Sequence, residues 1–198
     1  MYARIASFEG GNTERLRELN EQRLDAGTAN LPDGVLHALA LASRDGDSRL
    51  FVTLFDSREA IGAAEQRFEE MGDEIPEDVR GRRTSVEVYE VAMHEQPHDA
   101  AAARVSTLEG SPEQVDEGER YAEENVLPRA RQLAGWKGVL SLLDRESGRG
   151  KLITFWESAD AMEASAEQAN QLRDDSAQAA GAGVRSVEPY DLLFHRSF

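Results

Sequence analysis

The stretch FVTLFDS at residues 51–57 recurs as LITFWES at residues 152–158, with an offset of 101 residues. The same offset relates SVEVYEV at 85–91 to SVEPYDL at 186–192. A repeat of this length is too long for a solenoid unit and has the size of a small domain. The sequence therefore predicts a duplicated domain.

Two further matches set the limits of the repeats. RIASFEG at residues 4–10 matches RVSTLEG at 104–110 with an offset of 100, and GVL at 34–36 matches GVL at 138–140 with an offset of 104. The variation in offset indicates small insertions in loops. We predict a first ferredoxin-like repeat at residues 1–94, a linker at 95–102 and a second repeat at 103–198.

Each repeat has the order strand, helix, strand, strand, helix, strand, which is the ferredoxin-like βαββαβ unit. Both helices of such a unit cover the same face of its sheet. Yet VLHALAL at 35–41 and LITFW at 152–156 are apolar on both strand faces, where a sheet with one wet face would alternate. We therefore predict an α+β fold in which the two repeats pack sheet to sheet as a pseudo-dimeric α/β barrel.

Composition excludes several function classes. The chain of 198 residues carries a net charge of −16, which disfavours nucleic acid and anionic membrane as partners. It has no cysteine, which excludes disulfides and thiol catalysis. The sequence contains no apolar run long enough to span a membrane and no signal-peptide pattern, so we expect a cytoplasmic protein. Because one chain carries both repeats, we expect a monomer with an internal pseudo-dimer.

The GWKG stretch at 135–138, the LITFWES junction and the duplicated βαββαβ order resemble the dimeric α/β-barrel superfamily, most closely its antibiotic biosynthesis monooxygenase-like branch. In that superfamily two such domains, usually two subunits, join their sheets into a barrel. The resemblance implies a cofactor-independent oxygenase that acts on a small apolar organic molecule. The alternative is a non-catalytic domain of the same fold that binds a small molecule or serves as a scaffold.

The resemblance makes Trp156 a catalytic candidate, because haem-degrading members of the family keep a functional Trp at this position. Those relatives also have an Asn on the first strand and a His on the second helix. Neither the strand at 104–108 nor the helix at 161–172 supplies these residues. We therefore predict no haem and no other cofactor. The alternative for Trp156 is a large core residue packed under a helix.

Side-chain sizes differ between the repeats around Trp156. At an offset of 101, Phe55 becomes Trp156, Phe68 becomes Ala169 and Ile61 becomes Met162. We predict a substrate pocket bordered by Trp156, Ala169 and Met162; the alternative is that the larger indole fills the vacated volume. A cavity of several hundred Å³ with convergent polar groups would favour an enzyme, and a filled interior would favour the non-catalytic alternative.

His37 is the second catalytic candidate, since it lies in a strand where it could act as an acid or base in a cavity. The alternative is a core histidine with satisfied hydrogen bonds. We take Ser141 as its counterpart in the second repeat. His94 and His195 recur at equivalent strand ends, but no group of acidic residues with ligand spacing surrounds them, so we predict no metal site.

Arg4 and Arg104 recur on the first strand of each repeat. Because the first and fourth strands of this unit are neighbours, we predict the cross-strand ion pairs Arg4–Glu90 and Arg104–Asp191. The alternative is an arginine that lines a pocket and binds the anion of a substrate.

Overall fold

The computed structural model describes residues 1–25, 31–44 and 46–198. The chain forms two compact units: Met1–Val88 together with Leu193–Phe198, and Tyr89–Leu192. Two long strands, at residues 82–95 and 183–197, each contribute residues to both units. We describe each unit by itself, as unit 1 and unit 2.

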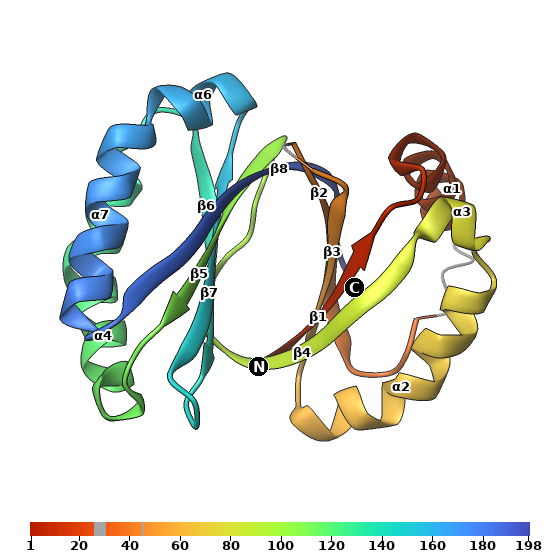
Figure 1. The fold of residues 1–198 in the computed structure, drawn as a ribbon, viewed down its shortest axis with the longest axis horizontal. Coiled ribbons are helices and arrows are strands. Elements are labelled where there is room, and N and C mark those ends of the chain that lie inside the picture. Colours follow the sequence, from red (N-terminus) through yellow and green to blue (C-terminus); the bar gives the residue numbers. More distant parts are fainter. Residues whose placement is uncertain (26–30, 45) are drawn as a thin grey trace. The chain divides into compact units, whose positions relative to one another are not determined.

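Unit 1 contains the elements of the first repeat, with its three helices on one face of its strands (Figure 1). Their order is β1 (Tyr2–Glu9), α1 (Thr13–Asp25), β2 (Val35–Ser43), β3 (Ser48–Phe55), α2 (Arg58–Asp73), α3 (Glu77–Arg80) and β4 (Arg82–Glu95). Ser57 begins α2, because its hydroxyl accepts a hydrogen bond from the Ala60 backbone N–H at 3.3 Å.

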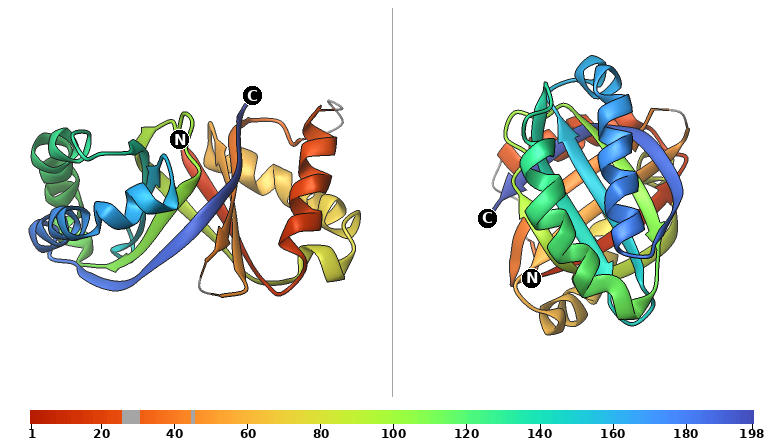
Figure 2. Two further views of the ribbon diagram at one scale, coloured as in Figure 1. Left: turned by 90° about the horizontal axis from the view of Figure 1, so that it is seen from above. Right: turned by 90° about the vertical axis from the view of Figure 1, so that its left-hand side faces the viewer.

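Unit 2 repeats this order with more broken helices. Its elements are β5 (Ala102–Glu109), η1 (Pro112–Gln114), α4 (Val115–Tyr121), η2 (Ala122–Val126), α5 (Leu127–Ala130), β6 (Trp136–Asp144), β7 (Arg149–Trp156), α6 (Ala159–Ala164), α7 (Ala166–Ala179) and β8 (Gly183–Ser197). Figure 2, right, shows α4 and α7 side by side across the strands of this unit. The helix equivalent to α2 is interrupted at Ser165, whose hydroxyl donates to the Ala134 carbonyl at 3.1 Å.

The strand register aligns the repeats more simply than the sequence suggests. Val35 lies opposite Phe55 in the first repeat, and Trp136 lies opposite Trp156 in the second; a bulge follows at the same place in both. The offset at β2 and β6 is therefore 101, and the offset of 104 predicted for this segment is wrong. It follows that the counterpart of His37 is Gly138, and the predicted counterpart Ser141 is also wrong.

Each unit has a core between its sheet and its helices. In unit 1, Phe55, Ile61 and Ala64 are buried and pack against Phe68 and Val35, among others. The corresponding core of unit 2 comprises Ala102, Trp156 and Met162, with Trp136 and Ala169 packed against it. Because four of the five residues named in each set correspond at an offset of 101, the two cores are versions of one packing arrangement.

The eight strands follow the order β1-β3-β2-β8-β5-β7-β6-β4, and that order closes as an antiparallel barrel. The predicted fold class, α+β with two ferredoxin-like βαββαβ repeats in an α/β barrel, is confirmed. β4 ends at Glu95 and β5 begins at Ala102, and the predicted division of the chain at a 95–102 linker stays a prediction. Across the described ranges, the helices are all too short or too polar to cross a membrane.

Candidate functional site

A cavity of about 60 Å³ lies between the sheet and the helices of unit 2. We call it the second-repeat cavity. Its walls are mostly apolar, and the larger apolar side chains that line it are Met93, Val126, Leu127, Leu133, Val139, Leu152 and Leu172. Side chains with polar groups also line it: Arg104, Ser106, Trp136, Thr154, Arg173 and Ser176. The site thus combines a hydrophobic wall with a small number of hydrogen-bonding groups, as ligand pockets do.

Two buried donors at this cavity have no hydrogen-bond partner among the described residues: Arg104 Nη1 and Trp136 Nε1. Arg104 is only 8% exposed, and its other terminal nitrogen, Nη2, donates to the Met162 carbonyl at 2.7 Å. Burial lowers the pKa of Arg104, and the nearby positive charge of Arg173 lowers it further, against the opposing effect of Glu163. An arginine stays charged under these conditions, so a cationic residue with one unsatisfied, buried donor lines the cavity.

Trp156 is fully buried and does not line the cavity. Its indole N–H donates to Thr154 Oγ1 at 3.0 Å, and its ring packs edge-on against Trp136 with 5.7 Å between ring centroids. Of the three residues predicted to border a pocket, Ala169 lines the cavity, whereas Trp156 and Met162 lie in the adjoining core cluster. Trp156 therefore contacts Thr154 and Trp136, two residues that line the cavity. The catalytic role of Trp156 stays a prediction.

The predicted cross-strand ion pairs of Arg4 and Arg104 are wrong. Arg4 binds Glu65 on α2, and Arg104 lies opposite Pro189 in the strand register, not opposite Asp191. The helix face that covers each sheet is closer to these guanidinium groups than the carboxylates of the neighbouring strand. The alternative, an arginine lining a pocket, describes the position of Arg104.

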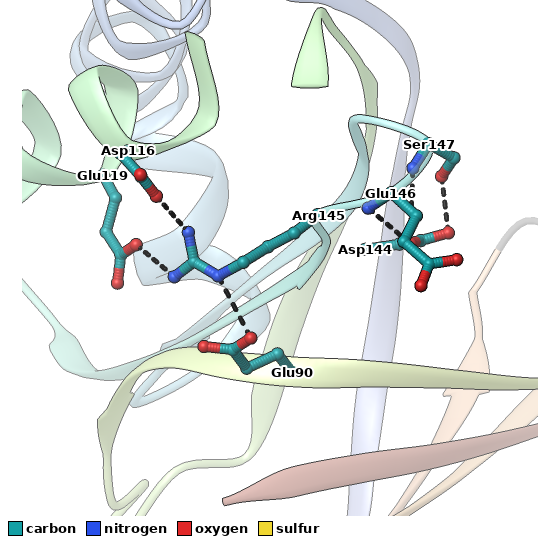
Figure 3. Close-up of polar contacts among 7 residues, drawn as sticks. All are labelled: Glu90, Asp116, Glu119, Asp144, Arg145, Glu146 and Ser147. Carbon is teal, nitrogen blue, oxygen red and sulfur yellow. Dashed lines mark hydrogen bonds and ion pairs between the residues drawn. The ribbon is translucent and has the colours of Figure 1, made fainter. Parts of the chain in front are cut away.

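Glu90, the predicted partner of Arg4, instead belongs to an ion-pair cluster around Arg145 (Figure 3). Arg145 also binds Glu119 at 2.7 Å and Asp116. The hydrogen bonds to Glu90 and Glu119 raise the pKa of Arg145, against the opposing effect of burial. Because the four side chains come from β4, α4 and the β6–β7 turn, their ion pairs fasten these segments of unit 2 together.

His37 belongs to unit 1, whereas the second-repeat cavity lies within unit 2. Its Nδ1 is 3.0 Å from Ser197 Oγ, and its ring stacks on that of His195 with 5.8 Å between centroids. Burial lowers the pKa of His37. His94 lies opposite Leu140 in the strand register. The described residues contain no group of three or more His, Asp or Glu side chains that could hold a metal ion. The catalytic role of His37 stays a prediction.

Among the lining residues that sequence reasoning missed are two with N–H donors in their side chains, Trp136 and Arg173. A constant offset of 101 would have found both, since it aligns Trp136 with Val35 and Arg173 with Gly72. The apparent GVL match hid the first of these substitutions. Both changes add a hydrogen-bond donor to the second repeat at a place where the first has none in its side chain.

No protein-family model matches the chain. An uncharacterised protein of Mycobacterium tuberculosis strain H37Rv is 29% identical over 171 residues, which are 80% of this chain and 76% of that protein. A second uncharacterised protein of the same strain is 39% identical over 95 residues, which are 48% of this chain and 40% of that protein. These relatives share the sequence pattern without adding an activity.

Solved structures show the same fold at low sequence identity. An anthrone oxidase-like protein has a TM-score of 0.65 at 19% identity, covering 99% of this chain and 92% of its own. A Listeria monocytogenes ferredoxin-fold protein related to antibiotic biosynthesis monooxygenases has a TM-score of 0.53 at 8% identity, covering 96% and 93%. A heme-degrading enzyme from the same species has a TM-score of 0.51 at 11% identity, covering 95% and 98%. The chain therefore has the dimeric α/β-barrel fold found in antibiotic biosynthesis monooxygenase-like proteins, as its sequence resemblance predicted.

Proposed function

We propose that the second repeat binds a small, largely apolar organic molecule in the second-repeat cavity. The observation that carries this proposal is an apolar cavity lined by Arg104 and Trp136, each of which has a buried donor without a protein partner within the described ranges. Buried donors are almost always satisfied in proteins, and leaving one unsatisfied costs free energy. A bound ligand with an acceptor atom would provide a partner for these donors, and its apolar part would pack against the hydrophobic wall.

The size of the cavity favours binding of a small molecule or of one end of a larger one. A cavity of about 150 Å³ lined by apolar side chains holds a benzene molecule. The second-repeat cavity, at about 60 Å³, is less than half that size. It is also far below the several hundred Å³ that would favour an enzyme with a drug-sized substrate. A binding domain is therefore the first candidate function.

Replacing Ala169 with phenylalanine tests this proposal. We expect Ala169→Phe to restore the residue of the first repeat, fill the cavity and abolish binding. The probes are 1-butanol, butyramide and butyrate, and the readout is the indole N–H resonance of Trp136, one of two tryptophans in the chain. The control Gln168→Phe adds the same ring at an exposed position of α7 and should leave the titrations unchanged.

A melting curve separates a filled cavity from an overpacked core. If the indoles already occupy the space, Ala169→Phe should lower the free energy of unfolding by about 1–3 kcal/mol. That result, with no probe moving the Trp136 resonance of the unmodified protein, would leave the proposed function without support.

A second candidate function is oxygenation without a cofactor, and the fold shared with an anthrone oxidase-like protein favours it. In such a reaction the deprotonated substrate is the electron donor to dioxygen, and buried N–H donors would stabilise its anionic oxygen. The residues that line the cavity include no Asp, Glu or His among those described, so the substrate would arrive ionised or lose its proton to water. Anthrone is far larger than the cavity, so only one end of it could enter; oxygen consumption with anthrone, above the rate in buffer and lost in Ala169→Phe, would favour this candidate.

A further inference from the structure

The two repeats keep the same arginine but give it different surroundings. Arg4 lies opposite Thr53 in the strand register, and Arg104 lies opposite Thr154, its counterpart at an offset of 101. Arg4 donates to both carboxylate oxygens of Glu65, from Nε at 2.8 Å and from Nη2 at 3.0 Å. Its guanidinium also lies over the Phe68 ring, 4.4 Å from the centroid. In the first repeat the arginine thus has a complete bidentate partner.

The second repeat lacks the carboxylate and the helix-side ring, and the Arg104 guanidinium lies instead over the Trp156 ring, 5.6 Å from the centroid. At the offset of 101, Glu65 corresponds to Ala166 and Phe68 corresponds to Ala169. A carboxylate and an aromatic ring are therefore each replaced by a methyl group, while the arginine is retained. The helix also breaks at Ser165, next to Ala166, and the Met162 carbonyl accepts from Arg104 Nη2. That single neutral acceptor replaces the two charged oxygens.

The second-repeat cavity also gains positive charge relative to the equivalent positions of the first repeat. Arg173, at the position of Gly72 in the first repeat, adds a second guanidinium to the lining. Arg173 itself bonds to Asn170 and Asp174, whereas Arg104 Nη1 has no partner among the described residues. The lining includes two arginines and, within the described ranges, no Asp or Glu. Glu163 lies near enough to oppose the burial effect on Arg104 but does not line the cavity.

We propose that the second-repeat cavity selects a small organic carboxylate, whose anionic group binds the guanidinium of Arg104 through the free Nη1 and so supplies the negative charge that Glu65 supplies to Arg4 in the first repeat. The short apolar tail of the acid would lie against Val139, Leu152 and Leu172. Trp136 Nε1 offers a second donor at the same cavity. This inference rests on the proposed function, because it names the chemical class of the ligand for that site.

Comparing an acid with neutral molecules of similar size tests the inference. We expect butyrate to bind the unmodified protein at least about tenfold more tightly than 1-butanol or butyramide, since charge-assisted hydrogen bonds are the stronger ones. Arg104→Met should remove this preference while keeping most of the side-chain volume. The readout is again the Trp136 indole resonance, followed through a titration at pH 7.

Ala166→Glu tests the same inference in a variant that keeps Arg104. It restores the residue of the first repeat, so the new carboxylate should occupy Arg104 and weaken butyrate binding about tenfold or more while 1-butanol binding changes little. Ala164→Glu adds the same charge at an exposed position of α6 and is the matched control. Its butyrate affinity should stay within about twofold of the unmodified protein.

The possible results separate the inference from the function on which it rests. If the neutral probes bind as tightly as butyrate, and Ala166→Glu has no effect on butyrate, then the cavity binds small molecules without selecting an anion. That outcome overturns the inference and leaves the proposed function in place. If none of the three probes moves the Trp136 resonance, both are overturned.

Discussion

At the scale of single residues, the contrast between Trp156 and its counterpart Phe55 shows how one position changes its neighbours. Phe55 packs edge-on against Phe68 of α2, with 6.1 Å between centroids. Trp156 packs edge-on against Trp136, which lies in the neighbouring strand β6, because Ala169 leaves no ring on the helix side. The aromatic partner has moved from helix to sheet, and space remains beside the helix.

His37 supports a prediction about pH. Burial lowers the pKa of His37, so the folded protein resists its protonation more than the unfolded chain does. The unfolded chain takes up this proton near pH 6.5, and the folded protein does so only at lower pH. Stability is therefore highest above about pH 6.5 and falls as the pH drops from there toward the lower folded pKa. The stacked ring of His195 would add repulsion if it too were charged.

We expect His37→Gln to lose part of the stability that the protein gains between pH 5 and pH 7.5. Denaturant midpoints at the two pH values measure this. His98→Gln, at an exposed position, is the control and should keep the full dependence of the unmodified protein. An identical pH dependence in His37→Gln would contradict the role assigned to burial of this ring.

At the scale of elements, both repeats use the same turn before the second strand. Gly34 and Gly135 have φ angles of 82° and 77°, in the region that favours glycine. Their carbonyls accept from the backbone N–H of Asp56 and Glu157, at 3.1 and 2.8 Å. The turn thus ties the start of the second strand to the end of the third, and it positions Trp136 directly after Gly135.

Gly135→Ala should destabilise the protein. The added Cβ would lie 2.5 Å from the Cβ of Ala161, and the backbone would have to hold a positive φ with a side chain. We expect a loss of about 1–3 kcal/mol, measured by chemical denaturation. Gly62→Ala is the matched control, because its Cβ would meet no atom within 4 Å in the middle of α2, and it should be neutral or stabilising. Equal stability of the two variants would contradict the turn argument.

At the scale of the whole molecule, one chain carries both repeats. The closed strand order gives each of the eight strands two hydrogen-bonded neighbours, so no strand edge is left to recruit a second chain. We expect light scattering at micromolar concentration to report a mass near 21.9 kDa, that of one chain. The concentration should be varied about tenfold as a control for weak association. A stable mass of two chains would overturn the expectation of a monomer.

The sequence was sufficient to predict the duplication, the βαββαβ order and the fold class. Strand and helix periodicity is a local property, and the two repeats show the same pattern independently. It also pointed to Ala169, through a change in side-chain size. It misplaced the partners of Arg4 and Arg104, and it misaligned Trp136 with its counterpart. Those features depend on which helix position lies over which strand position, and periodicity does not specify that register.

What the sequence determined by itself was therefore the architecture and the position at which the second repeat lost volume. Only the tertiary structure decided that Glu65 is the partner of Arg4, and thus that Ala166 leaves Arg104 without a carboxylate partner. The physical reason is that a carboxylate 61 residues away in the chain becomes a bidentate partner only when the helix packs on the sheet. A missing partner can be recognised only after that packing has shown where the partner should be.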